Sequence, residues 1–286
     1  MSAPSPVLVV GATGQQGSAV VRALQALPSP PQIRALSRNP DSPAAQKLKD
    51  QGVDVVRGDL TDSASLDAAL AGAGSAFLVT TLPATGAPTE DEQGKTFIDA
   101  AKRASLPFLV YTSVSDASTA NVPHFETKAK VEQALKDRGL KHAVVAPVAF
   151  YDNFPKTSGF GLMMALGVFD AALCGKKLQL VSTDDIGFVA AQMLSNPDKY
   201  AGRVVQLAGD DLSMADVQAA YSRVEGHAVW KAWLPSWITA LLPYDFKQMF
   251  RFFHDKGYSA DVAKVKDEFP QVKTLEEWLR AQRKAE

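Results

Sequence analysis

The stretch Gly11-Ala12-Thr13-Gly14-Gln15-Gln16-Gly17 decides the fold of this chain. It follows a short apolar run, Val7 to Val10, typical of a strand covered on both faces, and it opens a helical pattern from Ser18 to Leu27. In that context Gly11 permits a tight turn, Gly14 lets the backbone approach a pyrophosphate, and Gly17 lets the helix pack closely on the strand. The pattern therefore predicts a dinucleotide site, the alternative being a glycine-rich turn without a ligand.

The rest of the first half alternates apolar runs with helical patterns. Strands are predicted at residues 33–36, 53–56, 76–79, 108–111 and 140–145, and helices at 44–51, 63–71, 93–104 and 125–138. This alternation predicts an α/β fold with a doubly wound parallel sheet. After about residue 150 the rhythm is less regular, with helices at 184–194, 213–224 and 274–283 and a strand at 204–207.

We expect the two halves of the chain to share one sheet. Residues 1–154 are predicted to form the nucleotide-binding domain. Residues 155–286 are predicted to form a smaller α/β cap that binds a substrate or a partner.

Composition narrows the function classes. The chain has 286 residues, with 30 Lys plus Arg against 31 Asp plus Glu, which argues against a general nucleic-acid binder and against a polybasic membrane-surface protein. The single cysteine, Cys174, excludes an intrachain disulfide and a cysteine-based zinc site, and we expect it to be buried and inert. The four histidines show no zinc spacing, so no metal is expected.

The sequence also suggests a compartment. No apolar run reaches the roughly 18–20 residues of a membrane span, and the first residues carry no signal-peptide pattern. We therefore expect a soluble protein of the cytoplasm or nucleus, either a monomer or a homodimer.

The end of the second predicted strand indicates which dinucleotide binds. An acid at this place accepts from the ribose 2′-hydroxyl of NAD, but here the strand runs into Ser37-Arg38-Asn39-Pro40 with no acid before Asp41. Arg38 would pair with a 2′-phosphate, which favours NADP(H) over NAD(H). The alternative is that Arg38 is a solvated loop residue. Asp59, after the third strand, would either accept from the adenine amino group or cap a helix.

Several segments resemble one family. The glycine loop, Arg38-Asn39-Pro40, His124-Phe125-Glu126-Thr127-Lys128 and residues 147–154 are similar to motifs of the NmrA-like branch of the atypical short-chain dehydrogenases/reductases. The resemblance implies a Rossmann domain with a smaller C-terminal α/β part and an NADP(H) site.

Carried over by position, the resemblance assigns roles along the whole cofactor. The residues from Gly11 to Gly17 would hold the pyrophosphate, and Arg38 the 2′-phosphate. The other implied contacts are Asp59 and Leu60 at the adenine, Thr80 and Thr81 at the nicotinamide-side ribose, and Lys128, Phe150, Tyr151 and Asn153 at the nicotinamide end.

The catalytic pattern of the ordinary short-chain enzymes is incomplete. Their Tyr-x-x-x-Lys has His124 at the tyrosine position, followed by Lys128. Three hypotheses remain open. Lys128 only binds the ribose, and the protein is a redox sensor that acts through a partner such as a transcription factor. Lys128 is instead the general acid of an NADPH-dependent reductase of a small quinone, enone or carbonyl, as in isoflavone-reductase-like relatives. Or His124 donates the proton, against the simpler view of a helix-start histidine.

Three further features have two interpretations each. Ser113, just after the fifth strand, would bind a substrate carbonyl or would be an ordinary loop residue. Tyr151 would replace the missing phenol or, as we prefer, would pack in an aromatic core. The aromatic-rich segment 233–258 would be a substrate lid, a partner groove or a core of small helices. We favour the sensor that acts through a protein partner, without direct binding to nucleic acid.

Overall fold

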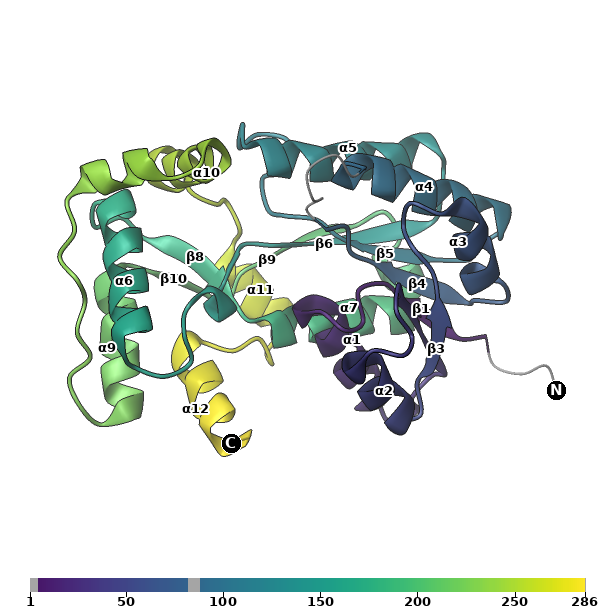
Figure 1. Ribbon diagram of the computed structural model, residues 1–286, viewed down its shortest axis with the longest axis horizontal. Helices are drawn as coiled ribbons and strands as arrows, with labels where there is room; N and C mark the ends of the chain where they lie inside the picture. The colour runs from purple at the N-terminus through teal and green to yellow at the C-terminus, as the bar shows by residue number, and fades with distance from the viewer. Residues whose placement is uncertain (1–4, 82–87, 286) are drawn as a thin grey trace. The chain divides into compact units, whose positions relative to one another are not determined.

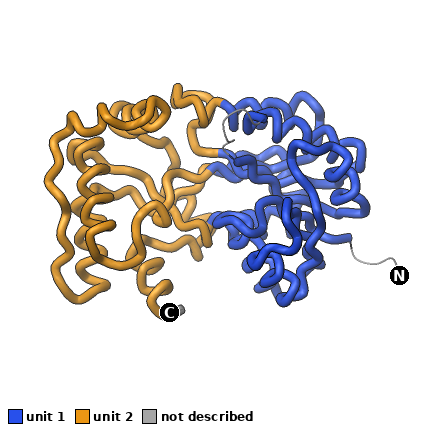
Figure 2. Tube along the Cα trace, viewed as in Figure 1, with its two compact units in different colours: residues 1–113, 127–146, 186–205 blue, residues 114–126, 147–185, 206–286 orange. Residues whose placement is uncertain are grey.

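The structure is a computed structural model that describes residues 5–81 and 88–285 (Figure 1). It divides into two compact units that interleave along the chain (Figure 2). Unit 1 takes residues 1–113, 127–146 and 186–205, and unit 2 takes 114–126, 147–185 and 206–286. Whether residues 1–154 and 155–286 divide the cofactor and substrate roles stays a prediction.

The described part of unit 1 is built around a seven-stranded sheet of order β3-β2-β1-β4-β5-β6-β9. Its strands are β1 (Val7–Val9), β2 (Ile33–Ser37), β3 (Asp54–Arg57), β4 (Ser75–Leu78), β5 (Leu109–Thr112), β6 (His142–Pro147) and β9 (Val204–Leu207). Strands β1 and β2, β2 and β3, β1 and β4, β4 and β5, and β5 and β6 pair in parallel. The order of the strands reverses between β1 and β4, as in a doubly wound α/β fold, so that prediction is confirmed.

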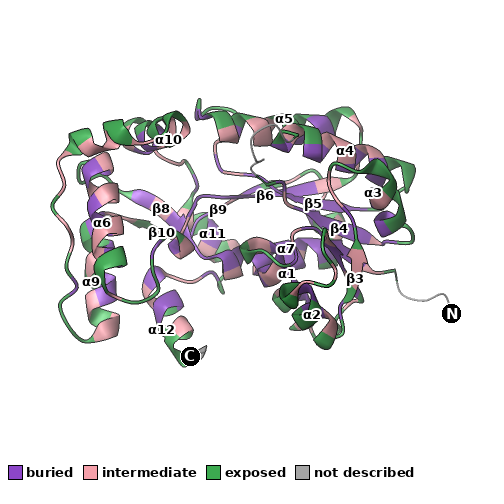
Figure 3. Cartoon of the chain, viewed as in Figure 1, coloured by how far each residue is buried: buried purple, intermediate pink, exposed green. Residues whose placement is uncertain are grey.

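Helices alternate with these strands because their apolar faces cover the sheet. They are α1 (Gln15–Gln25), α2 (Pro43–Asp50), α3 (Ser63–Leu70), α4 (Glu90–Arg103), α5 (Pro123–Asp137), α7 (Thr183–Ser195) and α8 (Pro197–Tyr200). Strands such as β1, β4 and β5 are buried along their whole length, which explains their continuous apolar runs (Figure 3). Helix α4 begins three residues before the predicted Gln93, and Glu90 in its first turn is only 2% exposed.

Strand β9, from the second half of the chain, belongs to the seven-stranded sheet, as expected, whereas unit 2 also has a sheet of its own that the sequence did not predict. Strands β7 (Ala149–Phe150), β8 (Leu178–Val181) and β10 (Asp210–Leu212) form it in the order β10-β8-β7. The helices of the C-terminal part are α6 (Phe160–Leu173), α9 (Met214–Glu225), α10 (Tyr244–Asp255), α11 (Val262–Glu268) and α12 (Leu275–Ala285), with short 3-10 turns η1 (Tyr151–Asn153) and η2 (Ser236–Leu241). Ser213 caps α9, accepting from Asp216 N.

The aromatic-rich segment has a mixed character. Phe250, Phe252 and Phe253 on α10 are buried in the core of unit 2. The large apolar side chains before them are at least half exposed: Trp233, Trp237, Leu241, Tyr244 and Phe246, together with Trp230. The segment is therefore part core and part apolar surface.

Cys174 is exposed, so its predicted burial is wrong. It follows α6 in a left-handed conformation with φ of 50°. The preceding residue, Leu173, is fully buried. Within the described residues, no helix combines the length and the apolar character that crossing a bilayer requires.

Candidate functional site

A cavity of about 850 Å³ lies in unit 1 at the carboxyl ends of four neighbouring strands. Its walls come from the segments that follow β1, β2, β3 and β4: Gly11, Thr13, Gly14, Gln15, Gln16, Gly17, Arg38, Asn39, Ser42, Asp59, Leu60, Thr61, Thr80, Thr81 and Gln93, among others. Ligands of open α/β sheets bind outside the carboxyl ends of the strands where the strand order reverses. The cavity therefore has the position expected of a nucleotide site.

Three glycines of the loop that lines this cavity, Gly11, Gly14 and Gly17, leave the backbone accessible because they carry no side chain. Gly11 has φ of +68°, and a Cβ on Gly17 would lie 2.1 Å from the Gly11 carbonyl oxygen. Ala12 belongs to the loop but is fully buried beneath it. The first turn of α1 contains no acidic residue, and Gly14 provides no side-chain cap. The N–H groups at the start of α1 and the helix dipole therefore favour an anion there.

The residues at the ends of β2 and β3 form one side of the cavity. Arg38 is exposed at this edge. Asp59 lines the cavity and accepts hydrogen bonds from Thr61 N and Thr61 Oγ1, each at 2.9 Å. Helix α3 is capped by Asp62, which accepts from Ala64 N and Ser65 N, so the alternative role of Asp59 as helix cap is wrong.

The opposite side of the cavity is held by two buried polar side chains of α4. Gln93 accepts from Thr81 N at 3.2 Å and donates to the Thr81 and Pro88 carbonyl oxygens at 3.1 Å. Glu90 accepts from Thr80 Oγ1 at 3.1 Å. The sequence interpretation missed both residues, because a polar run at a helix start is normally exposed; the T-x-x-E pattern from Thr89 to Glu92 signals the helix start but not the burial.

Lys128 is tied to the same carboxylate. Its Nζ lies 2.9 Å from Glu90 Oε1, and its side chain is 17% exposed. Thr127 Oγ1 donates to Glu90 Oε2 at 3.1 Å. The structure thus brings Lys128 into a network with Thr80, which lines the cavity.

Two further candidates, His124 as a proton donor and Ser113 as a carbonyl-binding residue, have local partners. His124 Nδ1 lies 2.6 Å from Asp245 Oδ2 within unit 2. Ser113 is 4% exposed and its Oγ donates to Glu132 Oε1 at 2.5 Å. Burial raises the pKa of Glu132 above its usual value.

Phe150, Tyr151 and Asn153 all belong to unit 2. Tyr151 is fully buried, and its hydroxyl donates to Asp210 Oδ2 at 2.9 Å. Burial, together with the Asp210 carboxylate, raises the pKa of Tyr151. This geometry fits the preferred interpretation of Tyr151 as a core residue. Phe150 is half-buried and Asn153 is exposed.

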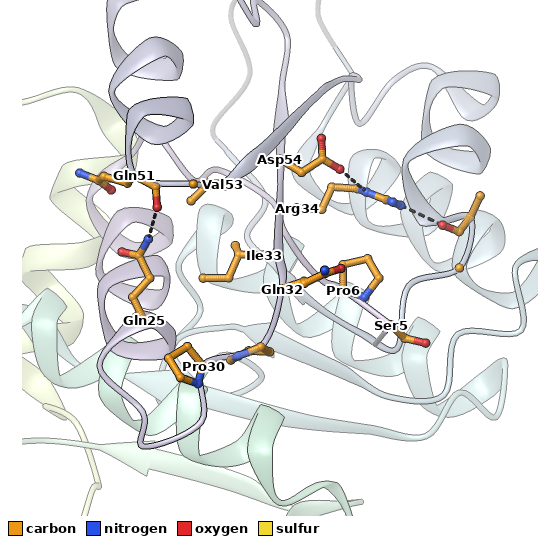
Figure 4. Close-up of a pocket in the computed structure, with 14 residues that line it drawn as sticks. Ser5, Pro6, Gln25, Pro30, Gln32, Ile33, Arg34, Gln51, Val53 and Asp54 are labelled. Atoms are coloured by element: carbon orange, nitrogen blue, oxygen red, sulfur yellow. Dashed lines mark hydrogen bonds and ion pairs between the residues drawn. The ribbon is translucent and has the colours of Figure 1, made fainter. Parts of the chain in front are cut away.

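A second cavity, of about 820 Å³, lies at the amino-terminal side of β2 and β3 (Figure 4). Its one guanidinium, on Arg34, already bonds to Asp54 Oδ2 and to the carbonyl oxygens of Ala69 and Ala71. Gln25 Nε2 donates to the Gln51 carbonyl oxygen across the same cavity. This cavity does not contain the glycine loop, and the fold does not use this edge for nucleotides.

Known proteins resemble the whole chain. The NmrA-like oxidoreductase FrzB of Cladobotryum sp is 32% identical over 265 residues, which cover 81% of this chain and 77% of that protein. The crystal structure of the Escherichia coli NADPH-dependent quinone oxidoreductase QOR2 complexed with NADPH is 25% identical, with a TM-score of 0.77 over 97% of this chain and 99% of that one. A crystal structure of NmrA, a negative transcriptional regulator, shares the fold at 22% identity, with a TM-score of 0.77 over 99% of this chain and 98% of that one.

The NADPH in the QOR2 structure agrees with the predicted class of cofactor. The NmrA-like family itself matches residues 4–279, which include every segment on which the resemblance in sequence was based. The chain therefore belongs to the NmrA-like family.

Proposed function

We propose that the protein is an NADP(H)-dependent oxidoreductase that reduces a small quinone, enone or carbonyl compound. The observation that carries this proposal is the cavity at the carboxyl ends of β1 to β4, which joins the glycine loop to Arg38 on one side and to Thr80 on the other. Residues 11–17 leave room for a pyrophosphate on the backbone, and Arg38 offers a planar charged fork to a 2′-phosphate. The residues that line the cavity therefore fit the phosphate groups of NADP(H).

The chemistry follows from these positions. The chemistry that NADPH would supply when bound at these residues is a hydride for the electrophilic carbon of the substrate. The substrate oxygen must then take up a proton, and Lys128 is the candidate donor. Its ammonium group lies next to Thr80, since both side chains bond to the same Glu90 oxygen. The same proposal includes Asp59 and Leu60 at the adenine and Thr81 at the ribose. The contacts of Phe150 and Asn153 at the nicotinamide end stay predictions, and Tyr151 is a core residue bonded to Asp210. The names of FrzB and QOR2 support the proposal, since both are oxidoreductases.

A regulator that acts through a protein partner is the second candidate function. It is favoured by the exposed apolar side chains between Trp230 and Phe246, because contiguous apolar surface often marks an interaction site. The His124 at the tyrosine position also favours it. In this case Lys128 would hold the cofactor and no substrate would be turned over.

Turnover separates the two candidates. We expect NADPH oxidation above the buffer rate with at least one compound from a panel of quinones, enones and ketones. Tight NADPH binding without turnover across the panel, together with a recovered protein partner, would instead favour the regulator.

The 2′-phosphate contact has its own test, Arg38→Ala. Since a charged hydrogen bond contributes about 1.5–3 kcal/mol, NADPH binding should weaken about 10- to 100-fold, while NADH binding should change little. Arg22→Ala, which removes the same charge from the exposed face of α1, is the matched control. Equal losses for NADPH and NADH after Arg38→Ala would refute the role of Arg38. If the protein binds neither nucleotide, the cofactor proposal fails.

A further inference from the structure

Glu90 is a buried carboxylate to which the proposed function assigns no role. It is 2% exposed in the first turn of α4, and its two oxygens accept from Lys128 Nζ, Thr80 Oγ1 and Thr127 Oγ1 at 2.9 to 3.1 Å. Burying an ion pair seldom stabilises a fold, because desolvation offsets the attraction between the charges. The Glu90–Lys128 pair therefore calls for an explanation other than stability.

The packing of two helices places this pair. A Cβ on Gly94 of α4 would lie 2.5 Å from Val131 Cγ2 of α5, so the two helices approach closely there. Glu90 lies one turn before Gly94, and Thr127 and Lys128 lie one turn before Val131. The close approach thus sets Glu90 against Thr127 and Lys128 by geometry, without any flexible loop.

The Glu90–Lys128 pair also lies next to Thr80, at one end of the row of strand ends that lines the cavity. The strand order β3-β2-β1-β4 places the segments with Asp59, Arg38, the glycine loop and Thr80 in that sequence along the sheet edge. If Arg38 takes the 2′-phosphate and the loop takes the pyrophosphate, the nicotinamide-side ribose falls on the Thr80 side. Glu90 Oε1 binds both Thr80 Oγ1 and Lys128 Nζ, which fixes two hydroxyl-binding groups relative to each other.

We propose that Glu90 is the positioning residue for the nicotinamide-side ribose, acting through Lys128 and Thr80; this rests on the proposed NADP(H) site. The ammonium group of Lys128 has three N–H donors, and Glu90 is its one partner among the described residues. By holding one N–H, Glu90 would leave the other two for a ribose hydroxyl and, during turnover, for the substrate oxygen. It also anchors the Thr80 hydroxyl, whose oxygen can still accept from the ribose.

The test compares NADPH with its adenosine-side fragment. NADPH reaches Lys128, whereas adenosine 2′,5′-bisphosphate lacks the second phosphate, the nicotinamide and its ribose, so it contacts only the Arg38 and glycine-loop side. In Glu90→Gln, an amide replaces the carboxylate at nearly the same size. We expect NADPH binding to weaken about tenfold, as for loss of one charged hydrogen bond, and binding of the bisphosphate to stay within about twofold.

A purely structural role for Glu90 predicts a different outcome. Distortion of the cavity would weaken both ligands together, and that result, or no change for either ligand, would overturn the proposal. Glu126→Gln is the matched control, since it removes the same charge from an exposed position on α5. If the wild-type protein binds the bisphosphate and NADPH with equal affinity, the nicotinamide-side contacts and this proposal fail while the adenine-side site stands.

A second variant separates the action through Lys128 from an independent effect. In a Lys128→Met background, Glu90→Gln should have little further effect on NADPH binding, because the group that it positions is gone. Lys128→Met alone leaves a buried carboxylate without its counter-ion, so the double variant should also be the more stable of the two. Additive losses in NADPH affinity would contradict the proposed coupling.

Discussion

At the scale of single residues, Glu132 is a half-buried carboxyl that accepts a hydrogen bond from a neutral hydroxyl. Ser113 Oγ donates to it, and burial raises its pKa above the usual value of about 4.5. The folded state therefore takes up a proton at a higher pH than the unfolded state does. Wild-type stability accordingly falls as pH rises from the unfolded pKa through the folded pKa, and the loss is complete above the folded value.

Glu132→Gln removes this titration. The free energy of unfolding of the variant, relative to wild type, should therefore rise with pH across that window and then stay constant. Urea unfolding between about pH 4 and 8 measures it, with the exposed Glu126→Gln as the control. A difference that does not vary with pH would contradict the raised pKa.

Residue by residue, the sequence predicts the parts of the cavity that follow strands. Arg38 and Asp59 follow predicted strands, so periodicity places them at one sheet edge, and the family resemblance adds Thr80 and Thr81 at the end of the next strand. Glu90 was not predictable in this way. Its partners Thr127 and Lys128 lie far along the chain on another helix, and local polarity at a helix start gives no sign of such contacts.

At the scale of elements, the contact between α4 and α5 at Gly94 leaves no room for a methyl group. Gly94→Ala should be destabilising by about 1 kcal/mol, because overpacking costs about 1–3 kcal/mol and the better helix propensity of alanine returns up to about 1 kcal/mol. In a Val131→Ala background the same change should be neutral or stabilising, since the clashing methyl groups are gone. Urea unfolding midpoints of the four proteins give the coupling, and additive effects would contradict the tight contact.

The elements themselves were unequally predictable. Strands of unit 1 appear as apolar runs because both faces are covered, and β9 has its predicted bounds. The three-stranded sheet of unit 2 has no such apolar runs. Strand β7 has only two residues, and β10 (Asp210–Leu212) contains two acidic residues. Helix α6 is apolar almost throughout, so it lacks the alternation of faces by which an amphipathic helix is identified.

At the scale of the whole molecule, the chain crosses between the units five times. A fragment of residues 1–154 would contain the glycine loop but would lack β9 and the part of α7 that belongs to unit 1. That part includes the buried Ile186 and Val189, and Gly187, where a Cβ would lie 2.8 Å from Ala19 Cβ of α1. We therefore expect the fragment to show no cooperative urea transition and no NADPH binding, with the full chain measured in parallel. A cooperative transition in the fragment would show that unit 1 folds without residues 186–205.

The same interleaving has a consequence during synthesis. Ribosomes add about 5–20 residues per second, so residue 205, the last of unit 1, is made roughly 3 to 12 seconds after residue 146. During that interval the edge of β6 that later pairs with β9 is unpaired. An unpaired strand edge can pair with other chains. The nascent protein is thus exposed to aggregation at one identifiable edge, and a chaperone that shields β6 would act there before the chain is complete.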